Sequence, residues 1–234
     1  RKKKSGTFPR SFNERMPKYY PIFVDIEGRR CLVVGGGEVA ERKVESLLQC
    51  GARVTVVSPR LTEGLSAFKK SGAIDVHLRE YRDGDTKGVV LVIAATDDNG
   101  VNAIVSREGS GAGIPVNVVD DPDKSTFIVP SVFKRGDIAI AISTGGKSPA
   151  LARRMRVELE KVFPVELSQL AQVLADIRAD FKGRGISADG EAWQDALDID
   201  VLLELLRQGK SGEARDRITD RLLENEQTAH SKRG

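Results

Sequence analysis

The chain has 234 residues, of which 40% are hydrophobic and 30% charged, a composition typical of a folded globular protein. No apolar run approaches the ~20 residues that a membrane span requires, so no membrane partner is expected. The net charge of +3 arises at one end, because residues 1–18 hold seven Lys/Arg and one Glu, or +6, which leaves −3 for residues 19–234. We therefore expect a basic, disordered leader over 1–18 and no nucleic-acid partner.

Cysteine and histidine usage points away from metal binding. Cys31 and Cys50 lie 19 residues apart and fit neither a disulfide framework nor a zinc site, and His77 and His230 have no ligand-type neighbours at suitable spacing. No apolar core follows the basic start, so no secretory signal is expected. These features predict a cytoplasmic protein without a metal site.

The first half of the chain alternates strands and helices. Residues 19–26 predict a short strand or a covering segment, and four apolar residues, 31–34, then run into three glycines and a helical pattern. Gly35, Gly37 and Ala40 have the G-x-G-x-x-G/A spacing, in which the glycines allow a tight turn and the approach of a pyrophosphate to the helix N-terminus. This stretch predicts a dinucleotide-binding turn.

Further elements in order complete an α/β pattern. We expect helices over 39–50, 61–71 and 98–108, and strands over 53–57, 74–79, 89–94 and 115–119. The pattern predicts a Rossmann-type doubly wound parallel sheet over 19–125. Ligands of such sheets bind beyond the carboxyl ends of the strands, so the turns at 35–37, 58–60, 96–98 and 120–121 should meet at one crevice.

After Asp121 the pattern changes. Residues 127–133 and 138–143 predict two antiparallel strands, and Ser148 and Pro149 suit the N-cap and first position of a helix that runs to about 163. We expect a small α+β segment over 126–163. Glycine-containing breaks at 182–185 and 209–212 then predict three helices in a helical subdomain over 164–234.

Two turns leave alternatives open. Many NAD sites have an acidic residue after the second strand, where this chain has Ser58-Pro59-Arg60. Either Ser58 binds the ribose of NAD, or Arg60 favours the 2′-phosphate of NADP. Asp120 is either a general base at the edge of the sheet or a turn residue of Asp-Asp-Pro-Asp, and spacing alone favours the turn.

The segment Gly145-Gly146-Lys147-Ser148 invites comparison with a phosphate-binding P-loop. That motif needs a glycine at position 141, where the chain has alanine, and the following Pro149 lacks a backbone N–H. The segment therefore predicts a helix start, with Lys147, that suits carboxylate groups.

Six blocks of the sequence resemble the precorrin-2 dehydrogenase family, which forms the N-terminal module of siroheme synthases. They are PIF (21–23), CLVVGGGEVAERK (31–43), AATDDNGVN (94–102), NVVDDP (117–122), FIVPS (127–131) and STGGKSPALARRMR (143–156). The resemblance implies a homodimer, with 126–163 at the interface, that oxidises precorrin-2 to sirohydrochlorin with NAD. Some members also insert Fe²⁺ as a substrate.

The resemblance also implies roles for individual residues. Asp120 matches the proposed catalytic aspartate of the family, which overturns the turn interpretation. Thr144 stands where the family often has serine. The expected cofactor-binding residues are Gly35, Gly37, Glu38, Val39, Ser58, Pro59, Arg60, Thr96 and Asp97, and those expected to bind the macrocycle's carboxylates are Ser143, Thr144, Gly145 and Lys147. Two alternatives remain: a Rossmann reductase of another small substrate, and a non-catalytic regulator that binds a dinucleotide or a tetrapyrrole.

Overall fold

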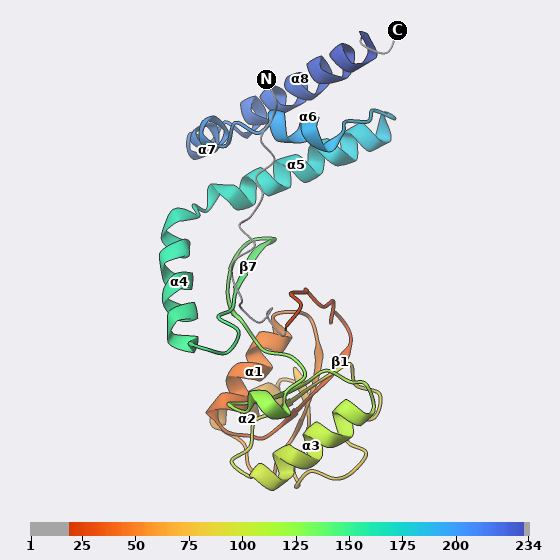
Figure 1. Cartoon of the computed structure of the whole chain (residues 1–234), viewed down its shortest axis with the longest axis vertical. Coiled ribbons are helices and arrows are strands. Elements are labelled where there is room, and N and C mark those ends of the chain that lie inside the picture. Colours follow the sequence, from red (N-terminus) through yellow and green to blue (C-terminus); the bar gives the residue numbers. More distant parts are fainter. Residues whose placement is uncertain (1–18, 232–234) are drawn as a thin grey trace, which may run out of the picture. The chain divides into compact units, whose positions relative to one another are not determined.

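The structure is a computed structural model that describes residues 19–231, with side chains described up to Glu224. The leader expected over 1–18 and the side chain of His230 lie outside this description. The chain divides into two compact units, and the boundary in the sequence lies between Val129 and Pro130 (Figure 1). Within the described part, no helix is both long and apolar enough to cross a membrane.

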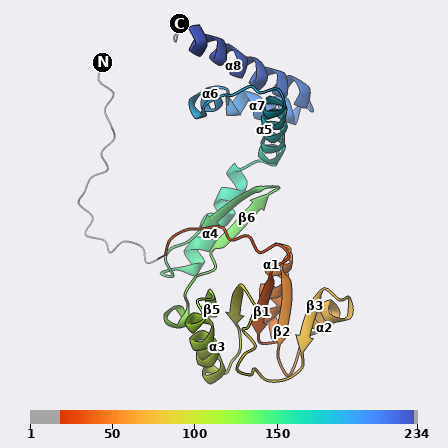
Figure 2. The ribbon, with the colours of Figure 1, turned by 90° about the vertical axis from the view of Figure 1, so that its right-hand side faces the viewer.

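The first unit is a five-stranded parallel sheet with helices on both faces. Its strands are β1 (Arg30–Val34), β2 (Arg53–Val57), β3 (Ile74–His77), β4 (Leu91–Ala94) and β5 (Val116–Val118), and its helices are α1 (Glu38–Leu48), α2 (Glu63–Lys70) and α3 (Asn99–Gly111). The strand order is β3-β2-β1-β4-β5, and Figure 2 shows these strands. The direction of winding reverses between β1 and β4, which confirms the predicted doubly wound fold.

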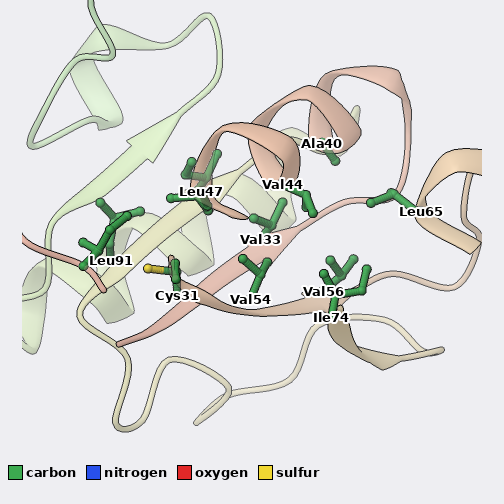
Figure 3. Close-up of a cluster of buried hydrophobic side chains, with 13 residues drawn as sticks. Cys31, Val33, Ala40, Val44, Leu47, Val54, Val56, Leu65, Ile74 and Leu91 are labelled. Carbon is green, nitrogen blue, oxygen red and sulfur yellow. The ribbon is translucent and has the colours of Figure 1, made fainter. Parts of the chain in front are cut away.

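Alternating strand residues supply the two cores of this unit. Cys31 and Val33 face α1 and pack with Ala40 and Val44 of that helix (Figure 3). The residues that alternate with these along the strands, such as Leu32, face the other side of the sheet. They form a second buried cluster with Val105 of α3. Burial on both faces explains why the strands are continuous apolar runs, and why their positions could be predicted.

The second unit begins with a β-hairpin and continues as helices. Strands β6 (Ser131–Arg135) and β7 (Ile138–Ile142) are antiparallel, and α4 (Pro149–Val162) follows them. Helices α5 (Glu166–Gly183), α6 (Gly190–Asp195), α7 (Ile199–Arg207) and α8 (Ser211–Ser231) complete the unit. Leu170, Ile177, Leu202, Ile218 and Leu222 are fully or almost fully buried in a core shared by α5, α7 and α8.

The described structure corrects two predicted elements and decides between two alternatives for a third. The strand predicted from 127 begins only at Ser131. The N–H of Thr126, just before it, is hydrogen-bonded to the carbonyl of Val116 (2.8 Å), and Pro130 has no N–H to donate to a neighbouring strand. The tail contains four helices rather than three, since residues 196–198 separate α6 from α7 without a glycine or proline. Residues 19–26 form no strand, which leaves the covering segment of the two expected alternatives, and Ile26 is buried in the core beside α1.

Candidate functional site

Four strands of the first unit end in one row. Val34 of β1 is paired with Val57 of β2 and with Ala94 of β4, which is paired in turn with Val118 of β5. Backbone hydrogen bonds extend the ladder one residue further, from Gly35 N–H to the Val57 carbonyl (2.9 Å) and from Val119 N–H to the Ala94 carbonyl (2.9 Å). The turns after these strands therefore share the carboxyl edge of the sheet, as the sequence predicted.

The first two glycines of the turn after β1 are required by close contacts. A Cβ on Gly35, whose φ is +127°, would lie 2.2 Å from the carbonyl oxygen of Ala95. A Cβ on Gly36 would lie 1.9 Å from the carbonyl oxygen of Arg60 and 2.6 Å from the hydroxyl of Ser58. Gly36 is not part of the G-x-G-x-x-G/A spacing, so this spacing does not reveal the glycine with the tightest contact.

Gly37 leaves space at the start of α1. It is the N-cap residue of that helix, no side chain caps the helix there, and a Cβ at Gly37 would meet nothing within 4 Å. Glu38 and Val39, the first residues of the helix, lie at this open end. Backbone N–H groups at an open helix N-terminus suit an anionic pyrophosphate, so the residues present fit a dinucleotide.

The polar groups of the turn after β2 form hydrogen bonds within the turn and with the glycine turn. Ser58 is buried, and its hydroxyl donates a hydrogen bond to the carbonyl of Arg60 (2.6 Å). The backbone N–H of Thr62 donates to the carbonyl of Gly36 (3.0 Å), so this turn is held against the glycine turn. Pro59 and Arg60 are exposed and line an open cavity of about 420 Å³ together with Lys69 and Lys70. The NAD and NADP interpretations both stay open.

In the turn after β4, two residues have structural roles and one does not. The Thr96 hydroxyl donates to the side-chain oxygen of Asn102 (2.9 Å), and Asp98 caps α3 by accepting from the N–H groups of Gly100 (2.7 Å) and Val101 (3.1 Å). Asp97 is exposed between them. Its carboxylate is the one in this turn that is left for a ligand.

The two adjacent aspartates after β5, Asp120 and Asp121, have different roles. Asp121 is the N-cap residue of a short 3₁₀ helix, η1 (Pro122–Lys124), and its carboxylate forms an ion pair with Lys124 (2.5 Å). The Lys124 side chain holds the pKa of the Asp121 carboxyl below its ordinary value. The turn role expected for this Asp-Asp-Pro-Asp segment thus belongs to Asp121.

Asp120 is different from its neighbour. It has a φ of +59°, and among the described non-glycine residues it alone has positive φ. This left-handed conformation is strained for a residue with a Cβ, although aspartate tolerates it better than most, and such outliers concentrate at functional sites. Asp120 is exposed, and within the described part of the chain its carboxylate accepts no hydrogen bond.

The residues predicted to bind the macrocycle lie in the second unit, in the loop between β7 and α4. Ser143 accepts a hydrogen bond from the N–H of Gly145 (3.0 Å), and the Thr144 hydroxyl accepts from the N–H of Ser148 (2.9 Å). Gly145 and Gly146 both have positive φ. The Ser148 hydroxyl caps α4 at Leu151 (3.2 Å), with Pro149 at the first position, as predicted. Lys147 is exposed at the helix start.

Metal ligands are not grouped in the described part of the structure. No cluster of three or more His, Cys, Asp or Glu side chains there could hold an ion. The buried thiol of Cys31 has its pKa raised to about 11, mainly by desolvation, so its metal-binding thiolate form is scarce at neutral pH.

Comparison with known proteins finds family matches to most of the first unit and to a segment of the second. A family described as "Putative NAD(P)-binding" matches residues 22–131, and one described as "Sirohaem biosynthesis protein central" matches residues 135–161. Siroheme synthase 1 of Aeromonas salmonicida is 44% identical over 211 residues, which cover 89% of this chain and 45% of that protein. The siroheme synthase of Nitrosomonas europaea is 41% identical over 207 residues, 87% of this chain and 43% of the relative.

A solved structure covers a comparable extent. The precorrin-2 dehydrogenase SirC matches with a TM-score of 0.67 and 27% identity, over 86% of this chain and 100% of that chain. The chain spans about half the length of the curated relatives it matches, and the whole length of SirC. With its NAD(P)-binding first unit and its sirohaem-biosynthesis segment, the chain belongs to the family of precorrin-2 dehydrogenases and siroheme synthase N-terminal modules.

Proposed function

We propose that the chain oxidises precorrin-2 to sirohydrochlorin, with NAD as the acceptor, on the route to sirohaem. The observation that carries this proposal is the exposed Asp120 carboxylate, in a left-handed conformation two strands from the glycine turn at the same sheet edge. The match to SirC over the whole length of that chain supports it.

The roles of the chain's own residues follow from their positions. Bound NAD would accept a hydride from the reduced macrocycle. The open N-terminus of α1, with Gly37, Glu38 and Val39, binds the pyrophosphate, while Arg60 and Asp97 contact the rest of the cofactor. Asp120 accepts the proton that leaves the macrocycle together with the hydride, so charge and atoms balance. Ser143, Thr144, Gly145 and Lys147 bind peripheral carboxylates of the substrate.

Fe²⁺ insertion is proposed as a second activity at the same carboxylate. Insertion of a divalent ion displaces two pyrrole protons, which need a base. Asp120 suits this step because its carboxylate is exposed and accepts no hydrogen bond from the described residues. Fe²⁺ is a substrate in this proposal, and sirohydrochlorin is its acceptor.

An anaerobic assay tests both activities. Precorrin-2 and NAD should give growth of NADH absorbance and the sirohydrochlorin spectrum, and added Fe²⁺ should then give the sirohaem spectrum. Asp120→Asn should abolish both while NAD still binds, because asparagine is also tolerated in the left-handed region. Asp123→Asn, an exposed residue of the same loop, is the matched control and should keep activity.

The outcomes separate the competing functions. Tight NAD binding with precorrin-2 left unchanged would indicate a regulator, and NAD-dependent turnover of a different small molecule would indicate an unrelated reductase. Either result contradicts the proposal.

We also propose that the chain acts as a homodimer through residues 126–163. Three apolar side chains on α4, Leu151, Met155 and Val162, are exposed and lie within one side of the helix at 100° per residue. Exposed apolar stripes of this kind are typical of interfaces. A second copy of the chain would cover them.

A further inference from the structure

A carboxylate on α1 is hydrogen-bonded to the start of α2. Glu41, in the first turn of α1, accepts a hydrogen bond from the hydroxyl of Thr62, the N-cap residue of α2. The same hydroxyl accepts a hydrogen bond from the N–H of Leu65 (3.2 Å), so Thr62 caps α2 and joins it to α1. Glu41 and Thr62 are both partly buried, where a hydrogen bond to a charged acceptor is stronger than in water.

The carboxylate of Glu41 has room in this position because residue 64 is glycine. A Cβ on Gly64, in the first turn of α2, would lie 2.1 Å from Oε1 of Glu41 and 2.8 Å from Oε2. Gly64 is helical and does not have a positive φ, so backbone conformation gives no reason for a glycine there. Glycine is unfavourable within a helix. The approach of Glu41 therefore accounts for Gly64.

The residue that Glu41 holds also closes the turn after β2. The N–H of Thr62 donates a hydrogen bond to the carbonyl of Gly36 in the glycine turn (3.0 Å). Pro59 and Arg60, which are proposed to contact the cofactor, lie between the end of β2 and Thr62. Thr62 is thus the point at which this turn is fixed both to α1 and to the glycine turn.

We propose that Glu41 is a positioning residue for the adenosine end of NAD. Its carboxylate holds Thr62, and through Thr62 it holds the turn of Pro59 and Arg60 beside the glycine turn. In Rossmann-type folds the residues after the second strand contact the adenosine ribose. A turn that is held in place before binding loses less conformational freedom when the cofactor binds, so affinity is higher. This role rests on the proposed location of NAD, but not on the identity of the substrate.

Gly64→Ala tests the proposal without changing either partner of the hydrogen bond. The new methyl group would displace the Glu41 carboxylate from Thr62, whereas alanine favours a helix more than glycine does, so the midpoint of urea unfolding should stay close to that of the wild type. NAD should nevertheless bind about fivefold more weakly, as expected for the loss of one hydrogen bond. Glu41→Ala should weaken binding equally, and calorimetric titration measures both. Glu45→Ala, at an exposed position of α1, is the matched control and should not change the affinity.

Nucleotide fragments show which end of the cofactor is affected. AMP and nicotinamide mononucleotide each carry one phosphate and differ in the nucleoside. Glu41→Ala and Gly64→Ala should raise the Kd for AMP about fivefold, and they should leave that for nicotinamide mononucleotide within about twofold. A residue that contributed only to stability would not separate the two fragments. Glu41→Gln, which can still accept a hydrogen bond from Thr62, should restore most of the affinity.

Kinetics distinguish this proposal from the proposed function. In Glu41→Ala the KM for NAD should rise about fivefold while kcat at saturating NAD is unchanged, because Glu41 acts on cofactor binding alone. Unchanged NAD affinity in Glu41→Ala and Gly64→Ala, or equal weakening of the two fragments, would overturn the role of Glu41. A wild type that binds NAD without oxidising precorrin-2 would contradict the proposed function instead, and the affinities would still decide the role of Glu41.

Discussion

Gly36 and Gly37, in the turn after β1, differ in the space around them, so their substitutions should have different effects. In Gly36→Ala the new methyl group would lie 1.9 Å from the carbonyl oxygen of Arg60, which is backbone and cannot rotate away. We expect the free energy of unfolding to fall by about 3 kcal/mol or more, in the upper range for overpacking. Urea unfolding followed by circular dichroism measures this loss.

Gly37→Ala should behave in the opposite way. Its φ of −86° is ordinary for alanine and the methyl group meets nothing within 4 Å, so the protein should fold with nearly unchanged stability. The methyl group would occupy the space expected for the pyrophosphate, so NAD should bind about tenfold more weakly, or about 1.4 kcal/mol. Calorimetric titration with NAD checks this, and unchanged affinity would remove the pyrophosphate from this turn.

A partly buried carboxylate outside the site, Glu108, links stability to pH. Glu108 on α3 accepts hydrogen bonds from the hydroxyls of Tyr81 and Thr86 and from the N–H of Gly84 (2.9 Å). Desolvation acts to raise the pKa of the Glu108 carboxyl, but these hydrogen bonds outweigh it and the pKa is lowered. Because the folded-state pKa lies below the unfolded one, the stabilisation is present above the unfolded pKa and is lost as pH falls.

Glu108→Gln tests this linkage. At pH 7 the variant should lose ~1–3 kcal/mol of unfolding free energy, since partners of a charged acceptor are left poorly paired. Between pH 7 and pH 4 its stability should fall less than that of the wild type. Urea unfolding at the two pH values, with Glu80→Gln as an exposed control, measures both effects. A parallel fall in both proteins would show that Glu108 contributes nothing to the pH dependence.

At the scale of elements, helix capping separates structural from ligand-binding acids. Asp98→Ala removes the N-cap of α3 and should lower the unfolding free energy by about 1 kcal/mol with little effect on NAD affinity. Asp97→Ala should weaken NAD binding and leave stability unchanged, because its exposed side chain does not cap the helix. Thermal unfolding and NAD titration of both variants provide the check, and a reversed pattern would exchange the two roles.

The sequence predicts a strand or helix well where burial alone determines its pattern of apolar residues. Strand β2 has the predicted bounds, Arg53–Val57, because an apolar run buried on both faces and ended by Ser-Pro has no competing interpretation. The run from Phe127 is also rich in apolar residues, but its first N–H is hydrogen-bonded to the carbonyl of Val116 at the start of β5 (3.4 Å), and a regular strand begins only at Ser131. The break between α6 and α7 contains no glycine or proline, and its one local signal is Asp198, the N-cap residue of α7, whose side chain makes no capping hydrogen bond.

The candidate site was likewise predictable only where a local sequence signal exists. Spacing marks Gly35 and Gly37, whereas the demand on Gly36 comes from the carbonyl of Arg60, which is brought near only by the fold. The left-handed backbone of Asp120 likewise depends on the loop after β5, not on its own sequence.

At the scale of the whole molecule, the open question is what covers α4. Leu151, Met155 and Val162 are 52%, 44% and 68% exposed, which is unusual for three apolar residues on one side of a helix. If a second copy covers them, charges placed there should be removed from water on association. Met155→Glu with Val162→Glu should therefore convert a dimer to a monomer.

Arg153→Glu provides the control for this prediction. Arg153 is exposed on the opposite side of α4, so it changes the charge of the helix without touching the stripe. Light scattering should give twice the chain mass for the wild type and for Arg153→Glu, and one chain mass for the double variant. Because the stripe lies outside the α5–α8 core, the monomer should keep its helical circular dichroism. A monomeric wild type would contradict the homodimer, and a dimeric double variant would exclude α4 from its interface.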